Sequence, residues 1–245
     1  MATDILALED VVAGYGKMTI LHGATCTVAR GAITTVIGPN GAGKSTMFKT
    51  IFGMLPARSG RVLFEGAEIT NLAPRDLLAR GISYVPQGRN IFPELSVRHN
   101  LELGAVMAPA GFDLLGRMEA AMARFPVLRR KADQQASTLS GGEQKILEIA
   151  RALLLEPKLM LVDEPSIGLS LIMVNELFAV LTEMRDRGIT VLLIEQNAKR
   201  ALESSDYGIV LELGRTRIAD TAKSILSDPR IGQLFLGGGL QEKVA

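Results

Sequence analysis

The sequence contains no tryptophan, and aromatic residues make up only 4% of its 245 residues. Proteins that bind single-stranded nucleic acid stack the bases on aromatic side chains, so this composition gives such binding little support. The formal net charge of +1 also provides no electrostatic reason to expect a nucleic acid as the main partner. We therefore expect no nucleic acid among the partners of the chain.

Cysteine is nearly absent as well, because Cys26 is the only one in the sequence. An intramolecular disulfide is thereby excluded, and a small buried thiol in a reducing compartment is the simplest interpretation. The opening residues MATDILALED lack a basic segment followed by an apolar one, so they do not resemble a signal peptide. No uncharged apolar run reaches the roughly 18 residues that a transmembrane helix needs. We expect a cytoplasmic protein that would serve a membrane only from its surface.

The strand pattern of the chain predicts an α/β fold. Two apolar runs, Leu159–Val162 and Thr190–Ile194, are separated by a helical segment from about residue 172 to 187. Such runs are typical of parallel strands buried on both faces of a sheet. The opening third is β-rich instead, with strands expected over Ile5–Val12 and Ala24–Val28.

Helical patterning dominates the middle of the chain, from about residue 93 to 157. Ile146, Ile149 and Leu153 recur there at the spacing of one helix face. We therefore expect a single domain over residues 1–245, with a catalytic core of about 1–92 and 157–245. A helical subdomain of about residues 93–156 would be inserted between the two parts of this core.

A glycine-rich loop follows the expected strand Ile33–Ile37. Its sequence, GPNGAGKST, has the pattern G-x-x-x-x-G-K-[ST] between a strand and a helix, which predicts a phosphate-binding loop. Gly41 and Gly43 allow the positive φ that turns consecutive N–H groups toward an anion. Lys44 is expected to reach the β- and γ-phosphates, and the Ser45 hydroxyl to bind Mg²⁺. The predicted nucleotide-binding residues of this loop are Gly38, Pro39, Asn40, Gly41, Ala42, Gly43, Lys44, Ser45 and Thr46.

An acidic pair, Asp163 and Glu164, ends the strand Leu159–Val162. Ligands of open α/β sheets bind at the carboxyl ends of the strands, so these side chains are well placed to act on a nucleotide. We expect Asp163 to hold Mg²⁺ through water and Glu164 to polarise the attacking water as a general base. Acidic residues also end strands simply because the chain reaches solvent there. The pair therefore indicates a nucleotide site only in combination with the phosphate loop.

The segment TLSGGEQKILEIARALLLEP begins at Thr138 and starts with S-x-x-E, a capping box for the helix that follows. Gly141 and Gly142 leave the first turn without side chains, and bare N–H groups at a helix N-terminus suit a phosphate. The stretch closely resembles the LSGGQ signature of ABC-type ATPases, with LSGGE here. The resemblance implies that Ser140, Gly141, Gly142 and Glu143 contact the nucleotide of a second subunit, so that two chains enclose two ATP molecules.

The resemblance to ABC-type ATPases also implies an architecture. It consists of a RecA-like P-loop NTPase core with a parallel sheet, an N-terminal antiparallel β subdomain and an inserted helical subdomain that carries the signature. Within this pattern, Tyr15 corresponds to the aromatic residue that stacks on adenine. The alternative is a surface tyrosine in a turn with no role in binding. Gln87 corresponds to the glutamine that contacts Mg²⁺ and water, and otherwise would be an ordinary loop glutamine. SIGLS, residues 166–170, corresponds to the loop that crosses the dimer interface.

The sequence departs from the family pattern at Gln196, where the family has a histidine that contacts the γ-phosphate. Glutamine can still donate an N–H to a phosphate oxygen and accept from water, but it cannot carry a proton. We therefore interpret Gln196 as a catalytic γ-phosphate sensor of reduced power; the alternative is a polar strand end that meets solvent. The only histidines, His22 and His99, have no sequence feature that favours a catalytic role.

Three segments narrow the resemblance: EQN at 195–197, GRNIFPELSV after Gln87, and LFLGGG near the C-terminus. They are similar to one of the two ATPase subunits of branched-chain (hydrophobic) amino-acid importers. The resemblance implies ATP and Mg²⁺ as cofactors, a second ATPase subunit, two integral membrane permease subunits and, indirectly, a solute-binding protein. The chain would then lie on the cytoplasmic face of the cell membrane.

Other functions stay open on the sequence alone. The same ATPase role could serve urea, short amides or another cargo. A soluble ABC ATPase that acts on nucleic acid or ribosomes usually has two ATPase domains or a long coiled coil, and this chain has neither a second GKS nor a heptad run. An ATP-gated regulatory subunit with little turnover is compatible with Gln196, whereas Lys44 and Glu164 favour an active enzyme.

Overall fold

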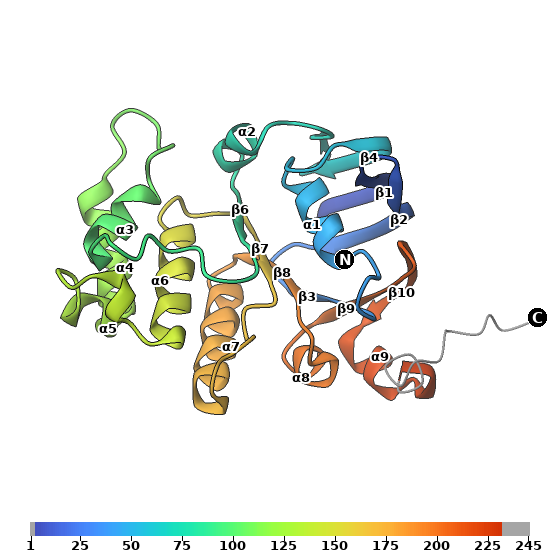
Figure 1. Cartoon of the computed structure of the whole chain (residues 1–245). Helices are drawn as coiled ribbons and strands as arrows, with labels where there is room; N and C mark the ends of the chain where they lie inside the picture. The colour runs from blue at the N-terminus through green and yellow to red at the C-terminus, as the bar shows by residue number, and fades with distance from the viewer. Residues whose placement is uncertain (1–2, 232–245) are drawn as a thin grey trace, which may run out of the picture.

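A computed structural model describes residues 3–231 of the chain, in which helices flank two β-sheets (Figure 1). An antiparallel sheet comes first, made of β1 (Asp4–Tyr15), β2 (Met18–Ala29), β4 (Ala57–Phe64) and β5 (Ala67–Glu68). Its strands have the spatial order β2-β1-β4-β5. The two predicted N-terminal strands are confirmed, but β1 and β2 pair beyond them on both sides, with register shifts along the way. The LFLGGG segment, residues 234–239, lies outside the described residues.

The second sheet has six strands in the order β10-β9-β3-β8-β7-β6. These are β3 (Ile33–Ile37), β6 (Ile82–Val85), β7 (Leu159–Asp163), β8 (Thr190–Ile194), β9 (Tyr207–Glu212) and β10 (Arg215–Thr221). All neighbours are parallel except β10, which pairs antiparallel with β9 at one edge. Every residue of β3, β7 and β8 is buried, which explains why the sequence shows apolar runs instead of alternation there.

Helices cover both faces of this sheet. They are α1 (Lys44–Ile51), α2 (Pro74–Ala79), α7 (Leu171–Asp186), α8 (Ala198–Glu203) and α9 (Ala222–Ser227). On α7, Leu177 and Leu181 share a buried apolar cluster with Met160 of β7. Phe48 of α1 belongs to another cluster that also contains residues of both sheets, so α1 fills the space between them. The helix that starts at the phosphate loop is thus held from two sides.

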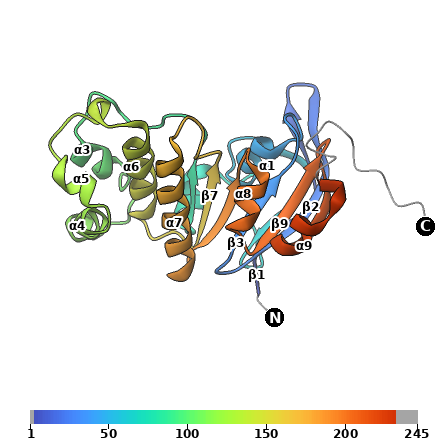
Figure 2. The same cartoon turned by 90° about the horizontal axis from the view of Figure 1, so that it is seen from below.

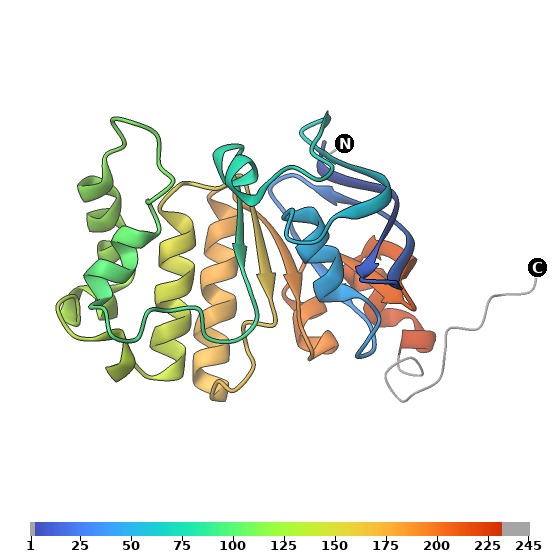
Figure 3. The same cartoon turned by 45° about the horizontal axis from the view of Figure 1, so that its top comes forward.

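A layer of helices forms one end of the molecule, as Figure 2 shows. It contains α3 (Val97–Leu103), α4 (Leu114–Arg124), α5 (Pro126–Arg130), a short 3-10 turn η1 (Ala136–Thr138) and α6 (Gly141–Leu153). Its apolar cluster includes Val97, Leu101, Met118, Leu128 and Leu147. Figure 3 shows α6 and α7 side by side, so α6 connects this layer to the core.

The predicted architecture is confirmed: an antiparallel N-terminal sheet, a core with parallel strands, and a helical insertion. The strand β6 was not predicted, because four residues with a serine among them carry too short an apolar pattern. Among residues 3–231 no helix has the length and apolar character needed to cross a bilayer.

Candidate nucleotide-binding site

Four adjacent parallel strands bring the predicted site residues to one edge of the sheet. β3 leads into the phosphate loop, β7 ends with Asp163, and Glu164 follows it directly. β8 is followed by Glu195 and Gln196, and β6 by Pro86 and Gln87. Since β3, β8, β7 and β6 are neighbours in this order, residues more than 150 positions apart in sequence lie at the same edge. This is where open α/β sheets bind their ligands.

The phosphate loop has the backbone shape that its glycines were expected to allow. Gly41 has φ of 82° and Gly43 has φ of 105°, both in the left-handed region. A Cβ at Gly43 would also lie 2.9 Å from a methyl carbon of Leu21, so space as well as conformation favours glycine there. The helix α1 starts at Lys44, immediately after the loop. Its first N–H groups and positive end therefore point toward the bend of the loop, as an anion site requires.

Lys44 is buried, and its ammonium group lies within the loop that precedes it. Nζ donates hydrogen bonds to the carbonyl oxygens of Gly38 at 2.8 Å and Pro39 at 3.1 Å. Burial lowers the pKa of Lys44, and the carboxylates of Glu164 and Asp163 partly oppose this effect. Two nearby acids therefore help to keep the lysine charged inside the site.

Asp163 is the last residue of β7 and is only 2% exposed. Its Oδ1 accepts a hydrogen bond from the Ser45 hydroxyl at 3.3 Å, and its Oδ2 accepts one from the Tyr84 hydroxyl at 3.2 Å. Burial raises the pKa of Asp163, while these two hydrogen bonds lower it in part. Ser45 and Asp163, two of the three residues predicted to bind Mg²⁺, are thus direct neighbours.

Glu164 lies beside Gln87, whose Nε2 donates to Oε2 of Glu164 at 2.9 Å. Its backbone is in the left-handed region, with φ of 45°, and its N–H donates to the carbonyl of Ile194 at 2.9 Å. Burial is the main cause that raises the pKa of Glu164; the Asp163 charge adds to it and Lys44 opposes it. A carboxylate with a raised pKa is a better proton acceptor than an ordinary surface glutamate.

Two residues that the sequence reasoning did not single out belong to this site. Tyr84, on β6, donates a hydrogen bond to Asp163. Glu195, directly after β8, accepts hydrogen bonds from Ser166 of the SIGLS loop. The Glu195 carboxylate accepts from the Ser166 N–H at 3.1 Å, from the Ser166 hydroxyl at 2.7 Å and from the Gln196 N–H at 3.2 Å. A glutamate placed directly after a buried strand was the only signal for Glu195. A tyrosine inside a strand gives no signal, because such residues are usually core.

Gln196 and Tyr15 are both exposed. Gln196 follows Glu195 at the carboxyl edge of the sheet, with Asn197 capping α8 right after it. Tyr15 is 46% exposed at the end of β1, and the Lys49 ammonium of α1 lies 5.8 Å from its ring centre. The aromatic ring is therefore held close to the helix that starts at the phosphate loop and stays partly exposed.

The signature segment forms the N-terminus of α6. Ser140 and Glu143 make both hydrogen bonds of the predicted capping box. Lys131 also donates to both carboxylate oxygens of Glu143, at 2.7 and 2.8 Å. Burial opposes ionisation of Glu143, but the bonds from Lys131 and Ser140 outweigh it and hold the pKa of this carboxyl below its usual value. Glu143 thus has a structural task, while Gly141 stays exposed.

Side chains of α6 hold the loop that follows Gln87. Lys145 donates to the Gly88 carbonyl at 2.9 Å and pairs with Glu148 at 2.5 Å. Glu148 accepts from the Asn90 N–H at 2.5 Å, and Arg151 donates to the Asn90 carbonyl at 2.5 Å. Lys145 and Glu148 are both buried, so this contact is part of the interior. Among residues 3–231, no hydrogen bond or ion pair joins Ser140–Glu143 to the phosphate loop of the same chain.

Comparison with known proteins assigns this arrangement to a family. The family model for the ABC transporter matches residues 21–167, which is more than half of the chain. The chain belongs to the ABC transporter family. Within the family it is an ATP-binding domain of the kind that hydrolyses ATP. Solved structures agree: an ATP-binding cassette of an ABC transporter in its ADP conformation has a TM-score of 0.85 and 32% identity, with 96% of this chain and 99% of that one covered.

Curated relatives in the ABC transporter family extend over nearly the whole chain. The high-affinity branched-chain amino acid transport ATP-binding protein BraG of Pseudomonas aeruginosa is 40% identical, covering 96% of this chain and 100% of BraG. The probable protein LivF of Archaeoglobus fulgidus is 38% identical, with 92% and 95% covered. The lipopolysaccharide export protein LptB of Escherichia coli is 31% identical, with 97% and 98% covered. The predicted resemblance to branched-chain importer subunits is thereby confirmed.

Proposed function

We propose that this ABC ATPase powers a membrane importer for branched-chain or other hydrophobic amino acids. The observation that carries the ATPase part is the meeting of four strand ends, where Ser45 lies 3.3 Å from Asp163 and Gln87 lies 2.9 Å from Glu164. Such an arrangement joins a phosphate loop, a metal-type ligand pair and a carboxylate with a raised pKa. The identity of 40% with BraG over nearly the whole chain supports the cargo.

ATP would occupy the loop Gly38–Thr46, with its adenine against Tyr15. The residues present fit Mg²⁺, because this ion binds through one or two protein oxygens together with phosphate oxygens and water. Ser45 and Asp163 supply a hydroxyl and a carboxylate at one point, and Gln87 would add its amide oxygen. When bound, the ion would neutralise charge on the phosphates. Lys44 would exchange its two loop carbonyls for phosphate oxygens.

Hydrolysis would depend on Glu164 and Gln196. Glu164 would accept a proton from the attacking water, and its bond to Gln87 fixes the direction of its carboxylate. Gln196 would donate its amide N–H to the γ-phosphate and orient the water with its carbonyl. Glu195 positions Gln196, since its carboxylate binds the N–H of that residue and the SIGLS loop together.

Assembly with a second ATPase subunit would complete each site. The exposed Ser140–Gly141 end of α6 and the SIGLS loop would face the nucleotide of that subunit, so that ATP binding closes the dimer. We further propose residues 93–156 as a helical subdomain inserted between the two parts of the catalytic core, about residues 1–92 and 157–245. Two permease subunits would take up its motion, with a solute-binding protein acting on them, while the chain stays peripheral on the cytoplasmic face of the membrane.

Two alternatives have specific support. The similarity to LptB, an export protein, supports a different cargo, and urea or short amides fit the same ATPase role. The exchange of histidine for Gln196 supports a low-turnover regulatory subunit. Uptake of labelled leucine, with labelled urea as comparison, into vesicles that contain the chain and its membrane partners would separate the cargoes.

The first experiment is steady-state Mg-ATP turnover of the purified chain with Glu164→Gln. The matched control is Glu176→Gln, on the exposed face of α7. We expect the wild type and Glu176→Gln to turn over equally, and Glu164→Gln to bind ATP but lose at least about two orders of magnitude in rate. Turnover that survives Glu164→Gln would contradict the catalytic role, and a wild type that binds without turnover would favour the regulatory alternative.

A further inference from the structure

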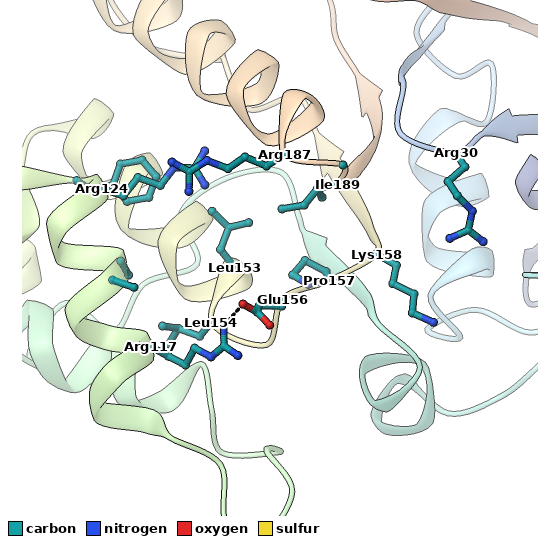
Figure 4. A pocket seen from close by; sticks show the side chains of 14 residues that line it. Arg30, Arg117, Arg124, Leu153, Leu154, Glu156, Pro157, Lys158, Arg187 and Ile189 are labelled. Carbon is teal, nitrogen blue, oxygen red and sulfur yellow. Dashed lines mark ion pairs between the residues drawn. The ribbon is translucent and has the colours of Figure 1, made fainter. Parts of the chain in front are cut away.

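A cavity of about 410 Å³ lies at the ends of the strands opposite to the nucleotide site (Figure 4). It is lined by α4, the end of α6, the residues that lead into β7, and the turn after α7. Its volume is within the range of pockets that bind small molecules. The cavity therefore lies between the helical layer and the core, away from every residue assigned above.

The lining of this cavity combines an apolar wall with a cationic rim. Leu153, Leu154 and Ile189 form part of the wall. Five cations, Arg30, Arg117, Arg124, Lys158 and Arg187, line it as well. Such a combination suits a ligand that has an apolar body and a negatively charged group.

The carboxylates around the cavity are too few for these cations. Arg124 and Arg187 share Glu183, at 3.4 and 2.6 Å. Arg30 and Lys158 share Glu65, at 2.7 and 2.6 Å. Arg117 alone has its own partner, Glu156. Five cations thus face three carboxylates, which leaves a positive excess.

Arg124 is the least satisfied of these cations. Its side chain is only 11% exposed, its buried Nε has no hydrogen-bond partner among residues 3–231, and its buried Nη2 reaches only the Glu183 carboxylate, at 3.4 Å. Figure 4 shows its guanidinium group and that of Arg187 turned toward each other. Burial lowers the pKa of Arg124; Glu183 opposes this, and the like charge of Arg187 adds to it. Two arginines that converge on one carboxylate hold donors ready for a further anion.

We propose that this cavity binds a small organic anion of the phosphate monoester class, with Arg124 and Arg187 as its main ligands. Planar guanidinium groups match the oxygen spacing of a phosphate, and two of them face each other here. The apolar body of the ligand would lie against Leu153 and Ile189. Because Arg124 belongs to the helical layer and Arg187 follows α7 in the core, the ligand would connect these two parts and so act on the helix that carries the signature.

The test uses the full chain labelled with 15N at arginine, with phenyl phosphate as the probe. At about pH 7 this probe is mostly a dianion, since the second pKa of a phosphate monoester is roughly 6. Inorganic phosphate and phenol are the comparison compounds, because each carries only one half of the proposed recognition. The Nε–H signals of Arg124 and Arg187 report binding at this place, whatever else binds at the phosphate loop.

Four variants accompany the wild type. Arg124→Gln removes the main ligand, and Ala120→Leu, on an exposed position of the cavity lining, blocks the space without changing any charge or weakening the helix. Arg129→Gln removes an arginine of the same helical layer that pairs with Glu119 and does not line the cavity. Lys44→Ala weakens phosphate binding at the nucleotide site only. Thermal unfolding of each variant shows whether it folds.

We expect phenyl phosphate to shift the Arg124 and Arg187 signals together with one dissociation constant, more tightly than inorganic phosphate and with no effect of phenol. Arg124→Gln and Ala120→Leu should each weaken binding by about tenfold or more, and Arg129→Gln and Lys44→Ala by less than about twofold. A signal of Arg124 that does not move, or a shift of Arg187 alone, would overturn the proposal. Equal losses in Ala120→Leu and Arg129→Gln would overturn it as well. None of these outcomes depends on transport or on ATP turnover.

Discussion

Gln196 determines what the end of β8 can contribute to catalysis. An amide donates and accepts hydrogen bonds but does not change its charge between pH 5 and 8, as a histidine does. Glu195 occupies the neighbouring position and is buried, with its carboxylate engaged by three donors. In the proposed mechanism, proton acceptance would therefore rest on Glu164, and Gln196 would act through geometry.

Replacement of Gln196 by alanine tests this view. We expect Gln196→Ala to slow Mg-ATP turnover about tenfold, equivalent to about 1.4 kcal/mol, because one hydrogen bond to the reacting phosphate is lost. The control is Lys199→Ala, three residues further on in α8, where the side chain is largely exposed. The measurement is the initial rate at saturating ATP. Unchanged turnover in Gln196→Ala would mean that this side chain meets solvent only.

Cys26 offers a second residue-scale test, of burial this time. Burial raises the pKa of the Cys26 thiol to about 12. Because the thiolate is the reactive form, a native chain at about pH 8 should not react with a disulfide reagent such as Ellman's reagent. One thiol per chain should react after unfolding in guanidinium chloride. Rapid reaction of the native protein would show that β2 opens far more easily than its packing indicates.

At the scale of elements, Glu195 makes the junction of β8 and the SIGLS loop sensitive to pH. Burial is the main cause that raises the pKa of Glu195, against the hydrogen bonds from Ser166. The folded chain therefore binds the proton more tightly than the unfolded one, whose glutamate pKa is about 4.3. Stability from this group is complete below that pH and is lost as the pH rises through the folded pKa.

The matching experiment compares urea unfolding of the wild type and Glu195→Gln between about pH 4 and pH 8. The glutamine variant has no charge to bury, so the wild type should lose stability relative to it as the pH rises through this window. Glu176→Gln, on the exposed face of α7, should follow the wild type throughout. A difference that stays constant with pH would contradict the raised pKa of Glu195.

The start of α6 is a second element whose stability can be measured. Ser140→Ala removes the side-chain half of its capping box and should cost about 1 kcal/mol of unfolding free energy, whereas Ser140→Gly should cost only a few tenths. Ser170→Ala, at the N-cap of α7, is a matched comparison with a similar expected cost. Urea unfolding gives both values. If Ser140→Ala lowers turnover but leaves stability unchanged, the serine acts on nucleotide and the cap contributes nothing.

The sequence predicted those parts of the molecule that depend on local patterns. β3 and β8 begin and end where the sequence indicates, because both are uncharged, largely β-branched runs with polar or glycine-rich residues directly after them. The contacts Tyr84–Asp163 and Glu195–Ser166 could not be predicted, since they join segments 79 and 29 residues apart that only the fold brings together. The cavity at Arg124 was missed for the same reason: its cations come from elements that only the fold brings together.

The whole molecule has two faces that would meet two different nucleotides. The phosphate loop is at the edge of the sheet, and the Ser140 end of α6 belongs to the helical layer. With a companion ATPase that carries a histidine at the position of Gln196, the two composite sites would be unequal. The site with the companion's histidine would be completed by the signature of this chain.

A mixed dimer therefore provides a prediction for the assembled molecule. Ser140→Arg in this chain should block the companion's site, and Gln196→Ala should slow only the weaker site. We expect Ser140→Arg to lower total turnover at least about fivefold more than Gln196→Ala, since the bulk of an arginine at the start of α6 would clash with a nucleotide-bound neighbour. The measurement is turnover of the purified mixed dimer. Equal losses would indicate two equivalent sites.

The hydrogen bonds between α6 and the loop after Gln87 affect how the two segments can move. Lys145, Glu148 and Arg151 recur at every third residue along one helix face, and together they hold the backbone at Gly88 and Asn90. Because the backbone is bonded at both Gly88 and Asn90, this part of the loop can shift little relative to α6. A displacement of Gln87 would therefore move α6 as a rigid body instead of being absorbed as local bending, and the exposed Gly141 at the start of the helix would move with it.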